Sequence, residues 1–123
     1  MSQGKGYVIE NTSEYLKFLI YDFDIGSYHL KPLHKSWLDK YIIAPSQYKS
    51  VQLMYTGYAS KGGAAEFNQH LAYLRASSAN NYVANRARIP VDSTTLDDPL
   101  LQDDDDPLQQ DGWRAVLVQV WYN

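Results

Sequence analysis

One serine and one lysine occur at a spacing that hydrolytic enzymes use. Ser46 and Lys49 match the S-x-x-K pattern of a serine nucleophile, and Lys61 begins a faint match to its K-T-G partner segment. Such enzymes need a much larger, two-part fold, so chance explains the match better. Ser60 lies one residue out of register with G-x-S-x-G, and no histidine and acid follow in a convincing order. Because no nucleophile can be paired with a base, we expect no enzymatic activity.

Metal ligands are also sparse. His29, His34 and His70 are too dispersed to specify a metal site, and the chain has no cysteine. They are therefore interpreted as surface histidines. The acidic segment 92–111 could bind calcium, but it lacks the glycine and ligand spacing of an EF-hand. We expect a solvated, mobile acidic loop there, dispensable for folding, and no metal or cofactor.

Charge is distributed unevenly along the chain. Residues 1–91 hold ten Lys or Arg against six Asp or Glu, whereas residues 92–123 hold one against eight. A mildly basic body with an acidic loop would repel a polyanion, and no basic stripe alternates with stacking aromatics. Nucleic acid is therefore not an expected partner.

The sequence leaves the cellular compartment open. No apolar run near Tyr7 has the length of a signal-peptide core, so no Sec signal is expected, and no stretch is apolar enough to span a membrane. The chain as written is expected to be soluble. It would be cytoplasmic, or periplasmic by a non-Sec route or after removal of a signal.

Hydrophobic periodicity predicts alternating strands and helices. The helix that begins at Pro32 is expected to end at Pro45. A longer helix over 64–85 is expected to bury a stripe of apolar side chains. That stripe comprises Phe67, Leu71, Leu74, Tyr82 and Val83. The predicted elements are strand 15–23, helix 32–45, strand 51–56, a turn over 59–63, helix 64–85, a short strand near 88–89, the loop 92–111 and strand 113–121.

These elements predict an α/β two-layer sandwich. Two helices should pack on one face of a mixed sheet of three or four strands. The whole chain, 1–123, has the length of one domain, with its core in about 15–90 and 112–122 and the acidic loop 92–111 as an insertion.

An ordered set of motifs resembles the OmpA-like family. In the segment 57–76, Gly57, Gly63, Phe67-Asn68, Leu71 and Arg75-Ala76 hold the places of its G-H-T-D-x-x-G turn and following helix. Upstream, Tyr21-Asp22-Phe23-Asp24 and Leu30-Lys31-Pro32 are similar to its F-D-F-D and L-K-P opening. Downstream, Arg114-Ala115-Val116-Leu117-Val118 is similar to its last strand. The resemblance implies the family's β-α-β-α-(β)-β fold.

The resemblance also implies a ligand, the diaminopimelate residue of the peptidoglycan stem peptide. In the family an aspartate in the turn binds its ammonium and an arginine on the helix binds its carboxylate. Arg75 matches the arginine, but Ser60 stands at the aspartate position. Tyr58 and Ala59 replace the preceding His and Thr, and Asp24 is the expected substitute carboxylate. Asn68 can contact the ligand, but it is more often a hydrogen-bonding residue at a helix start.

Two functions remain open at this point. A binding module of the cell envelope, with a weakened or altered stem-peptide site, predicts an open pocket at Arg75. A protein-interaction or scaffold domain on the same fold would have lost peptidoglycan binding, and its acidic loop or aromatic surface would meet a partner. The alternative interpretation of Arg75 itself is a helix-surface ion pair with the acidic loop. The missing aspartate favours the second function.

Overall fold

One mixed sheet organises the molecule. The computed structural model describes residues 2–60, 64–102 and 114–123. The strand order is β1-β2-β6-β3-β4, and β5 pairs with β3 further along the same edge. All pairings are antiparallel except those of β3 with β4 and β5. The strands are β1 Lys5–Asn11, β2 Tyr15–Tyr21, β3 Val51–Ser60, β4 Thr94–Leu96, β5 Leu100–Gln102 and β6 Ala115–Tyr122.

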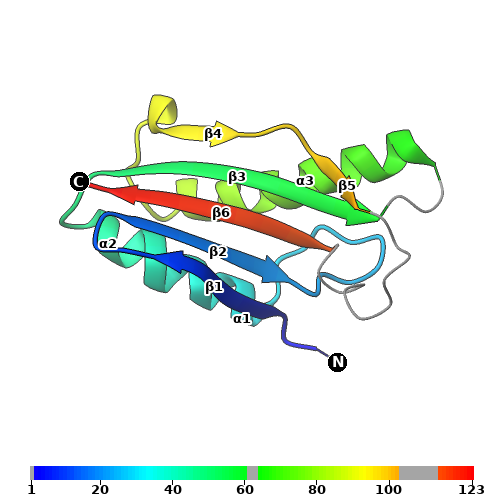
Figure 1. Ribbon diagram of the computed structural model, residues 1–123, viewed down its shortest axis with the longest axis horizontal. Coiled ribbons are helices and arrows are strands. Elements are labelled where there is room, and N and C mark those ends of the chain that lie inside the picture. Colours follow the sequence, from blue (N-terminus) through cyan, green and yellow to red (C-terminus); the bar gives the residue numbers. More distant parts are fainter. Residues whose placement is uncertain (1, 61–63, 103–113) are drawn as a thin grey trace.

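The helices cover one face of this sheet (Figure 1), which confirms the predicted α/β class. The sheet has six strands where the sequence predicted three or four. Alternation along the central strands explains the two-layer packing, because every second residue of β2 is buried. Six buried residues of β2 and β6 belong to the hydrophobic core on the sheet side, and they are Leu16, Phe18, Ile20, Val116, Val118 and Val120.

The first helical segment passes through Pro45, where the sequence predicted its end. α1 spans Pro32–Leu38, a π-helical turn spans Asp39–Ile43, and α2 spans Ala44–Ser46. The wider π turn shifts the hydrogen-bond register, as shown by the N–H of Ala44 donating to the carbonyl of Asp39. Pro45 then falls in the first turn of α2, where its missing N–H costs nothing.

The long helix α3, Ala65–Ala84, packs against β3 as closely as two backbones allow. A Cβ added to Gly57 would lie 1.8 Å from the carbonyl oxygen of Ala72, so only glycine fits there. The buried face of α3 is accordingly lined with small residues, and Phe67, predicted in the buried stripe, is 59% exposed. The buried residues of α3 are Asn68, Leu71, Ala72, Arg75, Ala76, Ala79 and Val83.

The sheet edges differ from the sequence-based prediction. Strand β1 was not predicted, since its apolar residues Tyr7, Val8 and Ile9 are consecutive and do not alternate with polar residues. In the structure all three are at least partly exposed at the sheet edge. No strand forms at residues 88–89, where the chain turns after α3. Within the segment predicted as a loop, a 3-10 turn at Val91–Ser93 leads into β4, and β5 follows. Parallel pairing with β3 stabilises both short strands. Because this pairing joins distant parts of the chain, the local sequence of β4 and β5 did not predict it. Residues 103–111 of that loop lie outside the described residues, as do Trp113 and most of the turn predicted at 59–63.

Within the described part of the chain, no helix has the length and apolarity needed to cross a membrane.

Candidate functional site

Arg75 is the most unusual residue of the buried core. It is only 1% exposed, although arginine is rarely buried without a charged partner. Its guanidinium donates three hydrogen bonds, all to backbone carbonyls. Nε donates to Ser27 O at 2.8 Å, one terminal nitrogen to Tyr58 O at 3.1 Å, and the other to Asp24 O at 3.3 Å. Arg75 thus ties the loop between β2 and α1 to the end of β3.

The charge of Arg75 has no carboxylate partner among the residues that the structure describes. Burial, and secondarily the neighbouring charge of Arg114, lower the pKa of Arg75 from its ordinary value to about 10. The guanidinium stays protonated at neutral pH, with its Cζ 5.6 Å from the centre of the Phe23 ring. Among the described residues, backbone dipoles and the face of the Phe23 ring are therefore what compensates this positive charge.

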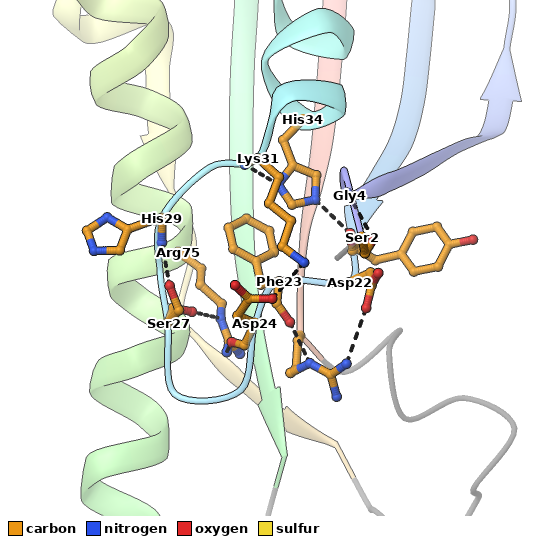
Figure 2. Close-up of polar contacts among 12 residues, drawn as sticks. Ser2, Gly4, Asp22, Phe23, Asp24, Ser27, His29, Lys31, His34 and Arg75 are labelled. Atoms are coloured by element: carbon orange, nitrogen blue, oxygen red, sulfur yellow. Dashed lines mark hydrogen bonds and ion pairs between the residues drawn. The ribbon is translucent and has the colours of Figure 1, made fainter.

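The loop that covers Arg75 begins where β2 ends. Asp22 has a positive φ of 63°, and this left-handed residue stops the predicted strand two residues early. Figure 2 shows the loop folding back, so that Ser27 and Asp24 meet the guanidinium that α3 projects toward them. Arg114, just before β6, holds the loop's start with a hydrogen bond to Phe23 O and an ion pair to Asp22 at 3.3 Å.

His34 anchors the other end of the loop and is fully buried, so its interpretation as a surface histidine was wrong. Its Nδ1 accepts the Lys31 N–H at 3.0 Å, and its Nε2 lies 2.6 Å from Tyr21 O, which can only accept (Figure 2). These partners select the neutral tautomer with the proton on Nε2. Phe23 stacks on the ring at 4.3 Å, and burial lowers the pKa of His34 despite the Tyr21 carbonyl.

The chain is similar to proteins of known structure. No protein-family profile matches the chain, and no curated protein sequence matches it. Solved structures do match. The OmpA-like domain of FopA1 from Francisella tularensis aligns with 100% of this chain and 84% of its own at 17% identity and a TM-score of 0.61. The chain has the OmpA-like fold.

Two further OmpA-like neighbours cover most of the chain. The cell wall anchor of the T6SS from Pseudomonas aeruginosa aligns with 96% of this chain and 88% of its own, at 15% identity and a TM-score of 0.67. The peptidoglycan-associated lipoprotein from Burkholderia pseudomallei aligns with 85% and 89%, at 14% identity and a TM-score of 0.60. At these identities the likeness concerns the fold.

The OmpA-like fold brings three of the residues singled out in the sequence to one place. Asp24 and Tyr58 meet Arg75, but through their backbone carbonyls. The Asp24 carboxylate is 67% exposed and forms an ion pair with Lys31 at 2.7 Å. Ala59 is buried, and Ser60 ends β3 opposite Gln102. Asn68 is 8% exposed two turns before Arg75, and its backbone N–H donates to Ala64 O in the first turn of α3.

Among the described residues, Arg75 lies under the loop 22–31 and is only 1% exposed, so the open pocket expected beside it is not seen there. Its expected ion pair with the acidic loop stays a prediction, because residues 103–111 of that loop lie outside the described residues. Sequence reasoning also missed the part played by His34 and Phe23. Their spacing carries no periodic signal, since the two residues meet only when the loop closes over α3.

Proposed function

We propose that this chain is a non-enzymatic binding module of the bacterial cell envelope whose ligand is the peptidoglycan stem peptide, bound with reduced affinity. The proposal is supported by the OmpA-like fold and by what its neighbours are called, a cell wall anchor and a peptidoglycan-associated lipoprotein. The residue that carries it is Arg75.

Arg75 is buried without a counter-charge among the described residues, and such a guanidinium is costly to maintain, which makes Arg75 a candidate for ligand binding. Arginine has five N–H groups, and three of those of Arg75 bond to backbone carbonyls. The remaining two have no partner among the described residues. A ligand carboxylate would accept these two N–H groups and supply the missing negative charge. Because Arg75 is buried, the loop 22–31 has to move for the carboxylate to reach it.

The ammonium half of the diaminopimelate residue would be held less well. Ser60 offers an uncharged hydroxyl at the end of β3, and the Asp24 carboxylate is already shared with Lys31. A charged hydrogen bond is worth roughly 1.5–3 kcal/mol, so its loss lowers affinity by about 10- to 150-fold. The proposed affinity is therefore below that of a site with a free aspartate.

Titration calorimetry with two matched peptides tests the carboxylate half. One is a stem peptide with a free diaminopimelate carboxylate, and the other carries that group as an amide. The free acid should bind at least tenfold more tightly, because only it neutralises Arg75. Equal affinities, or no binding of either peptide at millimolar concentration, would contradict the proposal.

Two substitutions on the loop test the ammonium half. Asp24→Asn removes the carboxylate at constant size and should weaken binding of the free-acid peptide. Lys31→Gln removes the competing cation and should strengthen it. If both variants bind the peptide like wild type, Asp24 does not contact the ammonium.

A protein-interaction domain that has lost peptidoglycan binding is the second candidate. It is favoured by the burial of Arg75 beneath the loop 22–31. It is also favoured by the edge strand β1, where Tyr7, Val8 and Ile9 are 48%, 38% and 45% exposed. An unpaired strand edge can accept a strand from a partner. Co-sedimentation with purified sacculi separates the two functions. Sedimentation of this protein with the sacculi supports the envelope module. If this protein instead stays in the supernatant, and if its strand β1 captures a partner from an envelope extract, the interaction domain is supported.

A further inference from the structure

A polar cavity lies at the opposite end of β3 from Arg75. It has a volume of about 330 Å³ and lies between the turn that leads into β3 and the segment that follows α3. Figure 1 shows α2, the start of β3, the C-terminal end of α3 and the end of β6 at this same end of the molecule. Residues 51 and 58 of β3 are about 23 Å apart in an extended strand, so this cavity is separate from the Arg75 site.

Two cations and three hydroxyls line the cavity. Lys49 comes from the turn before β3 and Arg88 from the segment after α3, so two parts of the chain that are distant in sequence supply one positive charge each. The hydroxyls belong to Ser46, Ser50 and Ser93. No acidic side chain of the described residues lines this cavity. Asp92 instead lines a neighbouring hollow of about 240 Å³.

The polar groups of the cavity remain available to a ligand. Neither Lys49 nor Arg88 forms an ion pair with any residue in the described part of the chain. Lys49 is held in place by the ring of Tyr122, whose centre lies 5.7 Å from its Nζ, and this contact leaves its N–H donors free. The hydroxyls of Ser50 and Ser93 bond to no described group, whereas Ser46 already donates to Ile43 O at 2.7 Å.

The remainder of the wall is apolar. Val51, Ile89 and Pro90 border the cavity beside the cations. A volume of 330 Å³ is at the lower end of the range for small-molecule sites, which combine an apolar wall with a few polar groups. A lysine, an arginine fork and two free hydroxyls together match a tetrahedral oxyanion with several acceptor oxygens.

We propose that this cavity is a binding site for a phosphoryl group. Lys49 and Arg88 neutralise the phosphoryl charge, Ser50 and Ser93 donate hydrogen bonds to its oxygens, and Ile89 and Pro90 contact the organic part of the ligand. The phosphoryl group can belong to a small soluble molecule or to a phospholipid headgroup. The site is independent of the proposed peptidoglycan site and would let one module contact two ligands at opposite ends of its sheet.

NMR titration with inorganic phosphate at constant ionic strength tests this site. The amide signals of Ser50 and Ser93 should shift and saturate in the wild-type protein. The Lys49→Gln/Arg88→Gln variant should lose at least tenfold in affinity while keeping its melting temperature, because both side chains are exposed. The matched control is Lys35→Gln/Lys40→Gln, which removes two exposed cations elsewhere and should bind phosphate like wild type.

Vesicles separate the two sources of the phosphoryl group. If the site binds a lipid headgroup, the wild-type protein and the control variant should sediment with phosphatidylglycerol vesicles. The Lys49→Gln/Arg88→Gln variant should then stay in the supernatant. Binding of inorganic phosphate without vesicle binding assigns it to a soluble phosphorylated molecule. The proposal is overturned if phosphate shifts no amide at the cavity, or if the two double variants bind it equally.

Discussion

The hydroxyl of Tyr55 offers the sharpest test of the described core. Tyr55 lies in the middle of β3 and is fully buried, and its hydroxyl is the one buried side-chain polar atom of the described residues without a hydrogen-bond partner. Leaving a buried hydroxyl unpaired costs about 1–3 kcal/mol. Tyr55→Phe removes only that oxygen, so we expect the free energy of unfolding to rise by about 1–3 kcal/mol.

Tyr122 provides the matched control for this substitution. Its hydroxyl donates to Tyr41 O at 2.6 Å, so Tyr122→Phe should lower the free energy of unfolding by about 0.5–1.5 kcal/mol. The same chemical deletion should thus change stability in opposite directions at the two positions. Urea denaturation measures both values, and each kcal/mol corresponds to a melting shift of roughly 3–6 °C in a chain of this length. A Tyr55→Phe variant less stable than wild type would refute the reasoning and would mean that the hydroxyl has a partner, such as a buried water.

Three further substitutions test the packing and the loop. Gly57→Ala should destabilise the fold by about 3 kcal/mol or more in urea denaturation, because its Cβ would meet the Ala72 carbonyl backbone, and a small effect would disprove the close helix–strand approach. Leu71→Ala should cost about 2–5 kcal/mol in the same assay, and an unchanged melt would remove Leu71 from the core. Burial holds the pKa of His34 below its ordinary 6.5, so the unfolded chain takes up the proton first and stability should fall as pH drops below about 6.5. His34→Gln should flatten that dependence, whereas substitution of the exposed His70 should not.

The OmpA-like elements were largely readable from the sequence because their signals are local. The alternation in β2, the glycine-free run of α3 and the apolar β6 each predict their element without help from the rest of the chain. The motif resemblance then ordered these elements into one fold and selected Arg75. Gly57 was part of that resemblance, although its physical reason, the approach of Ala72 to β3, appears only in three dimensions.

Long-range contacts decided what the sequence left open. Strands β1, β4 and β5 depend on pairing with β2 and β3, and none of them shows the alternating apolar pattern that predicted β2. The state of Arg75 is likewise tertiary, because the loop 22–31 supplies the carbonyls that cover it. By itself the sequence determined the class of fold and the presence of a cation on α3. Only the tertiary structure decided that this cation is buried and without a counter-charge among the described residues, since burial and hydrogen bonding depend on segments about 50 residues apart in the chain.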